Sequence, residues 1–103
     1  MKIKFVGLHD LKDEEKSQFE TLVVDHCEKF EKHWNRFIKP ENEMNLGVKK
    51  YNRDGKRVKY SVHVHAVLPK FNLSASADDW DINSVLNELF DKINNEAKRH
   101  YKA

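Results

Sequence analysis

Two pairs of side chains in this sequence are of types that carry out chemistry in other proteins. His63 and His65 are two residues apart, so on a strand both imidazoles would point the same way and could share a metal ion. No third ligand lies at metal-ligand spacing nearby, so solvent-facing histidines are the simpler interpretation. His26 and Cys27 are neighbours, but adjacent helical residues point about 100° apart, and Cys27 falls on an apolar stripe that predicts a core position.

The sequence also lacks the motifs on which common catalytic sites are built. It has no glycine-rich phosphate loop, no nucleophile elbow and no His-Glu-x-x-His pattern. We therefore expect no enzyme activity, no metal and no cofactor.

Basic side chains are concentrated in the middle of the sequence. Residues 41–77 carry seven lysines and arginines against three acidic residues, whereas residues 12–40 and 78–103 are both mildly acidic. The net charge of +2 does not by itself identify a nucleic-acid-binding protein. What matters is whether the fold gathers these cations on one surface.

The composition predicts one globular domain. The chain has 103 residues, of which 35% are charged and 39% hydrophobic, and its six Phe, three Tyr and two Trp supply core material. Cys27 is the only cysteine, which excludes an internal disulfide, and no stretch has the pattern of a signal peptide or a membrane span. We expect a single cytoplasmic domain over residues 1–103 that does not contact membranes.

The apolar pattern of the first forty residues predicts a strand followed by a long helix. Residues 2–5 alternate lysine with an apolar side chain, which is the period of a strand. The helix begins with Asp10 or Asp13 as its N-cap and ends at Pro40. Its apolar stripe recurs at spacings of three and four: Phe19, Leu22, Val23, Cys27, Phe30, Trp34 and Phe37.

Two alternating runs in the middle of the sequence predict a β-hairpin. They cover residues 44–48 and 58–68, with an Asp-Gly pair between them. A two-residue turn at that pair would set Val48 opposite Ser61 and mix the two faces. A three-residue loop with its glycine in the left-handed conformation sets Val48 opposite Tyr60 and keeps the faces separate, so we prefer this register.

A fourth strand and a second helix complete the predicted elements. The strand over 73–77 is expected to pair with the preceding one, Leu73 opposite Leu68. Asp79 or Asp81 then caps a helix. The apolar stripe of this helix is Ile82, Val85, Leu86, Leu89, Phe90, Ile93, Ala97 and Tyr101.

This order predicts an α+β fold of the form β-α-β-β-β-α. Each helix has one apolar stripe and the four-stranded sheet has one apolar face, so both helices must cover the same side of the sheet. The other side is left open.

The open side would be cationic. In the preferred register, Lys49 lies opposite Lys59, and their repulsion costs stability unless an anion lies over them. One interpretation is a phosphate-binding surface, with Tyr51 stacking on a base or sugar and Arg53 and Lys56 extending it around the turn. The other is a solvated face whose lysines discourage aggregation. The side chains predicted to face this side are Lys2, Lys4, Lys49, Tyr51, Arg57, Lys59, Ser61, His63 and His65.

Residues near the C-terminus follow the pattern of a known family. Residues 73–102 resemble the end of the ribosome hibernation-promoting factor and ribosome-associated inhibitor family, also called ribosomal subunit interface proteins. That family has a strand ending in His-Ala-x-Ala-Glu, then Asp-Met-Tyr-x-Ala-Ile-Asp, Asp-Lys-Leu and a basic tail. Residues 3–7 and 29–34 are similar to its first strand and the end of its first helix. The positions that match the C-terminal pattern in kind are Ala75, Ala77, Asp81, Leu86, Asp91, Lys92, Arg99 and His100.

The resemblance implies a β-α-β-β-β-α fold and a non-enzymatic ribosome-binding factor. Proteins of this family bind the small ribosomal subunit in the channel used by mRNA and tRNA, and they silence idle ribosomes under stress. They contact ribosomal RNA largely through basic residues on the two helices. Lys29, Lys92 and Arg99 match such basic positions, whereas a family arginine falls on Asn95 and a glutamine on Glu96.

These differences shift the expected contacts from the helices toward the hairpin. The expected partners are the small ribosomal subunit and its ribosomal RNA, and a homodimer is possible. The residues expected to bind RNA are Lys4, Lys29, Lys32, Arg36, Lys49, Tyr51, Arg53, Lys56, Arg57, Lys59, Lys92 and Arg99.

Three alternative functions remain open at this stage. A double-stranded-RNA module shares part of the element order, but Asp78, Asp79 and Asp81 would repel phosphates from the start of the last helix. A protein-interaction or homodimerisation domain could use the open face or a strand edge. A metal-dependent enzyme is the most remote.

Overall fold

One mixed sheet and two helices make up the structure. The computed structural model describes residues 1–53 and 57–101. The strands lie in the order β1-β2-β3-β4, with β1 parallel to β2 and the other pairs antiparallel. The elements are β1 (Lys2–Val6), the 3-10 helix η1 (Leu8–Asp10), α1 (Asp13–His33), β2 (Glu43–Arg53), β3 (Arg57–Val67), β4 (Asn72–Asp79) and α2 (Ile82–Tyr101).

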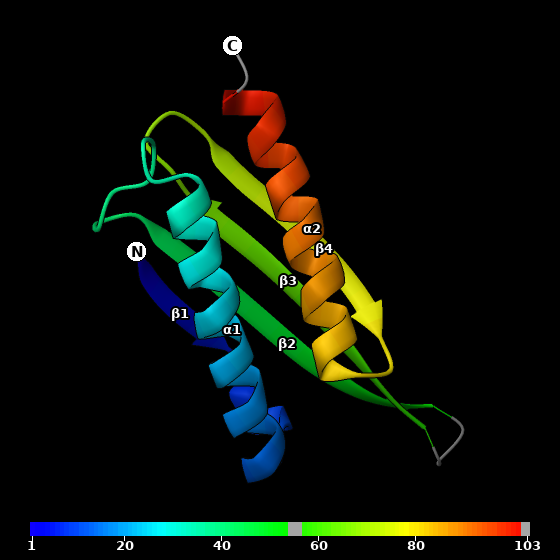
Figure 1. The fold of residues 1–103 in the computed structure, drawn as a ribbon. Coiled ribbons are helices and arrows are strands. Elements are labelled where there is room, and N and C mark those ends of the chain that lie inside the picture. The colour runs from blue at the N-terminus through cyan, green and yellow to red at the C-terminus, as the bar shows by residue number, and fades with distance from the viewer. Residues whose placement is uncertain (54–56, 102–103) are drawn as a thin grey trace.

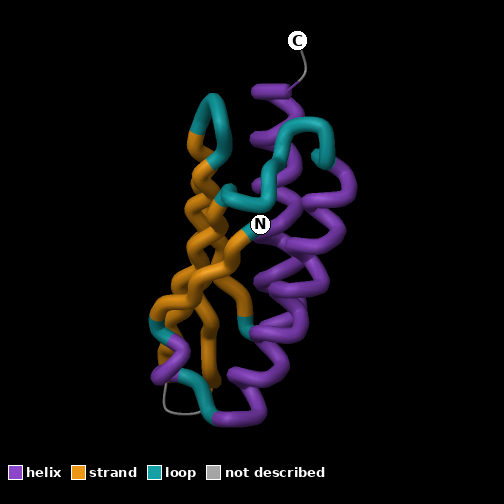
Figure 2. Tube along the Cα trace, turned by 90° about the vertical axis from the view of Figure 1, so that its left-hand side faces the viewer, coloured by secondary structure: helices purple, strands orange, loops and turns teal. Residues whose placement is uncertain are grey.

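Both helices lie on the same side of the sheet. Figure 1 shows α1 and α2 crossing in front of the strands, and Figure 2 shows the sheet edge-on with both long helices on its right-hand side. The predicted α+β fold, with its order and its open face, is confirmed. Neither helix in the described part of the chain is long and apolar enough to cross a membrane.

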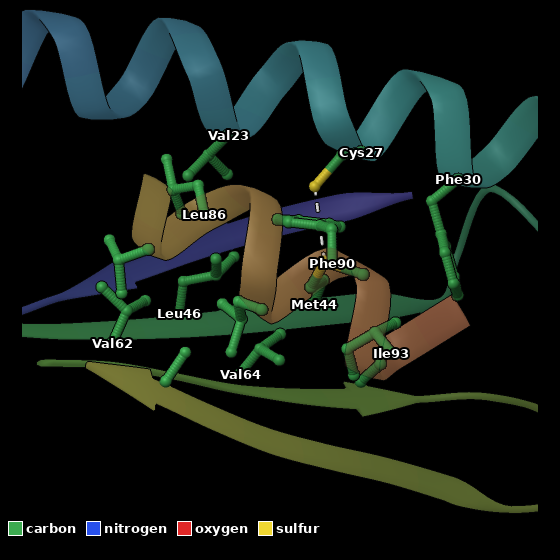
Figure 3. Close-up of a cluster of buried hydrophobic side chains, with 14 of the residues drawn as sticks. Val23, Cys27, Phe30, Met44, Leu46, Val62, Val64, Leu86, Phe90 and Ile93 are labelled. Atoms are coloured by element: carbon green, nitrogen blue, oxygen red, sulfur yellow. Dashed lines mark hydrogen bonds between the residues drawn. The ribbon is translucent and has the colours of Figure 1, made fainter. Parts of the chain in front are cut away.

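The core fills the space between the helices and the sheet (Figure 3). Side chains from α1, α2, β2 and β3 meet there, and no polar or charged residue of the described ranges is buried. Cys27 lies inside this core, with its Sγ 3.4 Å from Sδ of Met44. Burial raises the pKa of the Cys27 thiol to about 12. The predicted core position is confirmed, and a thiol that keeps its proton at neutral pH does not act as a nucleophile.

The register of both antiparallel pairs differs from the prediction by two residues. Val48 lies opposite Val62 rather than Tyr60. Leu73 lies opposite Ala66 rather than Leu68. A shift of two residues leaves every side chain on its own face, so the apolar pattern cannot distinguish such registers and the loops decide. The predicted hairpin loop includes residues 54 and 55, which lie outside the described residues.

The predicted limits of α1 were partly wrong, whereas the start of α2 is confirmed. Lys12, not Asp10 or Asp13, is the N-cap residue of α1, and its backbone N–H donates to Glu15 Oε1 at 2.9 Å. The α-helix ends at His33, before Pro40, and the chain continues through turns. Asp81 caps α2, accepting the backbone N–H of Ser84 at 2.9 Å. A glutamate in the first turn of α1 thus reaches back to accept the backbone N–H of the N-cap residue, as the third helical residue does in a capping box.

A polar contact ties the start of α1 to the hairpin. Lys50 Nζ lies 2.7 Å from Glu15 Oε1, and the Tyr60 hydroxyl donates to the other carboxylate oxygen. Burial acts to raise the pKa of Glu15, but the hydrogen bonds from Lys50, Tyr60 and the Lys12 backbone outweigh it and lower the pKa to about 2. Burial and the bond to Glu15 raise the pKa of Tyr60 to about 12. The ionised, carboxylate form of Glu15 is therefore favoured in the folded state.

Candidate nucleic-acid interface

The open side of the sheet gathers cations along the β2–β3 hairpin. Lys49, Tyr51, Arg57 and Lys59 all lie on this side, because they alternate with side chains that face the helices. Lys49 pairs with Ser61, and Tyr51 pairs with Lys59. The predicted Lys49–Lys59 pair is therefore wrong. The observed register places an aromatic ring beside Lys59 instead of a second cation, which reduces the repulsion.

Trp80 joins this surface and was missed by the sequence analysis. It follows β4, and the residue is 42% exposed. The Arg57 guanidinium carbon lies 4.0 Å from the centre of the indole ring, and Lys59 Nζ lies 5.3 Å from it. Both distances are within the range of cation–π attraction. Ser76 and Asp78 alternate with apolar residues along β4, and extending that alternation by two residues predicts Trp80 on the open side.

We call this set of five side chains the hairpin face: Lys49, Tyr51, Arg57, Lys59 and Trp80. Its two rings are both exposed, Tyr51 at 46%. Its three cations form no ion pair within residues 1–53 and 57–101. Exposed rings beside unpaired cations are the features that bind single-stranded nucleic acid, through stacking and phosphate contacts. Aspartates border it on the β4 side: Asp78 lies opposite Ser61, and Asp79 and Asp81 flank Trp80 in the sequence.

Two residues predicted to extend this surface, Arg53 and Lys56, are not fully described by the structure. The backbone of Arg53 ends β2 opposite Arg57. Its side chain lies outside the described part of the structure, and so does the whole of Lys56. Their predicted roles at the turn stay predictions.

The two histidines of the open side lie two residues apart on β3. The His63 ring lies across Gly47 of β2, since a Cβ built on that glycine would fall 2.1 Å from the ring. His65 is exposed farther along the same strand. Within the described ranges, no group of three or more His, Cys, Asp or Glu side chains is placed to hold a metal ion.

Of the six predicted cations that lie outside the hairpin face and have described side chains, four are paired with acidic groups. Among the helical residues, Lys29 lies 3.2 Å from Asp25, and Arg99 lies 3.3 Å from Glu96. Lys92 Nζ lies 3.6 Å from Glu88 and donates to the backbone carbonyl of Ser76 at 2.7 Å. Lys4, at the β1 edge of the open side, lies 3.2 Å from Glu43. These contacts reduce the positive potential that each residue presents to an RNA phosphate.

Lys32 and Arg36 are exposed on or after α1, and neither is ion-paired among the residues that the structure describes. They lie on the helical side, away from the hairpin face. The structure therefore divides the predicted residues between two opposite sides of the molecule (Figure 2).

A polar groove of about 780 Å³ runs between α1 and α2. It is lined by Lys29 and Lys98 and by three amides, Asn87, Asn94 and Asn95. His26 also lines it, stacked on Phe90 with ring centres 4.7 Å apart. Burial, with a smaller effect of the Lys29 charge, lowers the pKa of His26, so its imidazole adds no charge to the groove at neutral pH. Asn95, where the resembling family has an arginine, leaves this groove less cationic.

Comparison with solved structures identifies the fold. No protein-family model matches the sequence, and a search of curated proteins finds no significant match. The chain is similar to a ribosomal subunit interface protein from Coxiella burnetii, with a TM-score of 0.64 and 16% identity over 100% of both chains. It is also similar to the N-terminal domain of Thermus thermophilus Protein Y, with a TM-score of 0.59 and 18% identity over 97% of this chain and 99% of that one. The fold implied by the sequence resemblance is thus confirmed: the protein has the fold of these two structures along essentially its whole length.

Proposed function

We propose that this protein is a non-enzymatic ribosome-binding factor of the hibernation type, which binds small-subunit ribosomal RNA and inhibits translation under stress. The observation that carries the proposal is the fold similarity to a ribosomal subunit interface protein, which extends over all of both chains. The resemblance of residues 73–102 to the hibernation family supports the same function. A role in the cytoplasm, where ribosomes work, goes with it.

The hairpin face is the surface that we propose for the first contact with RNA. Its cations have no carboxylate partners within the described ranges, so an incoming phosphate does not have to displace an ion pair. Tyr51 and Trp80 offer rings on which unpaired bases can stack. The helical cations Lys29, Lys92 and Arg99 are secondary contacts, because each must leave an acidic neighbour to bind phosphate.

Co-sedimentation with purified small ribosomal subunits tests the proposal. At low salt the protein is expected in the subunit pellet, and it should be released progressively as salt is raised, because each phosphate contact releases counterions. Adding the protein to a cell-free translation reaction should lower the yield of a reporter in the same range of salt. The absence of any association at low salt would rule out ribosome binding.

A second candidate function is a protein-interaction or homodimerisation domain. It is favoured by the exposed apolar side chains on the open side, including Val6 at 63% and Val67 at 40% exposure. Sedimentation equilibrium over a range of protein concentrations distinguishes the two functions. A dimer that forms equally well after Lys49→Glu and Lys59→Glu substitution would favour this alternative over RNA binding.

A double-stranded-RNA module is less consistent with the structure. Such modules bring the start of the last helix onto phosphates. Here Asp81 occupies the N-cap of α2, and Asp78 and Asp79 end β4 just before it. This acidic cluster would repel the phosphates that a double-stranded-RNA module must hold.

A further inference from the structure

A second aromatic and basic surface lies at the end of the molecule opposite the hairpin. Three segments meet there: the turn that follows α1, the connection between β3 and β4, and the last turn of α2 (Figure 1). They enclose a mostly apolar pocket of about 490 Å³, which we call the end pocket. This volume is within the range of small-molecule sites.

The apolar lining of the end pocket is aromatic. Phe37 stacks on Tyr101, with ring centres 3.9 Å apart and planes 14° apart. Phe71 stacks on His100 at 4.2 Å and 18°, and lies 4.9 Å from Tyr101. Phe37, Phe71 and Tyr101 are each only partly buried, so ring surface remains accessible in the pocket. Flat rings that already stack on one another are suited to receive another flat ring.

Apart from Pro69, the remaining lining of the end pocket is basic. Arg36, Lys39, Lys70 and His100 line it, and no acidic residue does. None of these four side chains has an ion-pair partner among the residues that the structure describes. The charge complementarity therefore favours an anionic ligand.

We propose that the end pocket binds a single nucleotide unit, with its base against the aromatic rings and its phosphate against the basic side chains. An inorganic anion would leave the aromatic lining unused, and a neutral apolar ligand would leave three unpaired cations, Arg36, Lys39 and Lys70, beside it. A nucleotide is both flat and anionic. The unit is either a free nucleotide or an unpaired nucleotide of an RNA chain. This inference concerns a different surface from the hairpin face and does not depend on ribosome binding.

Titration of the intact protein with nucleotide fragments tests the inference. The probes are adenosine and guanosine 5′-monophosphate, adenosine without phosphate, and ribose 5-phosphate without a base. Aromatic NMR signals of Phe71 and Tyr101 report binding at the end pocket, and those of Trp80 report binding at the hairpin face. The monophosphates should give saturable shifts at Phe71 and Tyr101, and each incomplete probe should bind at least about tenfold more weakly, a difference of about 1.4 kcal/mol.

Substitutions then assign the two parts of the site. Phe71→Leu removes a flat ring but keeps an apolar side chain, and Lys70→Glu reverses an exposed charge. Each should weaken nucleotide binding at least about tenfold. Lys16→Glu is the matched control, since it makes the same charge change at an exposed position near the start of α1, outside both surfaces, and should leave binding at the end pocket unchanged. Circular dichroism confirms that each variant is folded.

The outcomes separate this inference from the proposed function. If nucleotides bind at the end pocket while small subunits do not bind, the inference stands and ribosome binding fails. If a short single-stranded RNA binds at the end pocket more tightly than mononucleotides do, the bound unit is part of an RNA chain. If mononucleotides bind more tightly than the RNA, the ligand is a free nucleotide. Ribose 5-phosphate binding as tightly as the monophosphates would overturn the inference, and so would the absence of shifts at Phe71 and Tyr101.

Discussion

At the scale of single residues, Glu15 has the most strongly shifted carboxyl group in the described structure. Its pKa falls from 4.5 to about 2 in the folded protein. The unfolded chain therefore binds more protons than the folded one between these values, so the free energy of unfolding falls as pH is lowered from about 4.5 to about 2. Above that range the contribution of Glu15 to stability is complete.

The variant Glu15→Gln tests this contribution. We expect it to lower the free energy of unfolding at pH 7 by about 1 to 3 kcal/mol, because Lys50 and Tyr60 lose a charged acceptor. It should also flatten the decline of stability at acidic pH. Urea unfolding at several pH values measures both effects. Glu14→Gln, at an exposed neighbouring position, is the control, and equal unfolding curves for the two variants would contradict the account.

Alternation and spacing in the sequence predict many individual positions correctly. They place Cys27 in the core and Tyr51 on the open side. They do not reveal which cations are neutralised, because a pair such as Lys29 with Asp25 depends on side-chain conformations as well as on spacing. Trp80 was missed because it follows two aspartates just before a helix cap, where the strand pattern is assumed to have ended.

At the scale of elements, the hairpin register is the feature that sequence alone could not fix. The apolar face is the same in registers that differ by two residues, so the pattern predicts the face but not the partner. The observed register brings Tyr51 beside Lys59, and Lys59 lies near Trp80, which directly follows the neighbouring strand β4. The hairpin face is thus a product of the pairing of three strands.

Trp80→Ala tests whether this pairing produces a stacking surface. We expect it to weaken binding of a labelled single-stranded RNA by about 1 to 3 kcal/mol, the value of one base stacked on an aromatic ring. Fluorescence anisotropy of the RNA measures the effect. Val67→Ala removes an exposed apolar side chain from the far end of β3 and should leave the affinity unchanged. Equal affinities for the wild type and Trp80→Ala would show that the indole does not stack on RNA.

At the scale of the whole molecule, the two layers present different kinds of positive charge. The molecule measures 48 × 22 × 17 Å across its Cα atoms, with the hairpin at one end and the end pocket at the other. The hairpin face carries unpaired cations with exposed rings, whereas the helical cations Lys29, Lys92 and Arg99 are paired with acidic neighbours. The account therefore predicts that RNA approaches the hairpin face first.

The most direct test compares two triple charge reversals in binding to purified small ribosomal subunits. Lys49→Glu, Arg57→Glu and Lys59→Glu together change the hairpin face, and a matched triple variant reverses Lys29, Lys92 and Arg99. Affinity is measured at several salt concentrations. The hairpin variant should bind far more weakly, with the slope of log affinity against log salt reduced by about 2 to 3, and the helical variant should change much less. A helical variant that loses binding while the hairpin variant keeps wild-type affinity and slope would contradict the account.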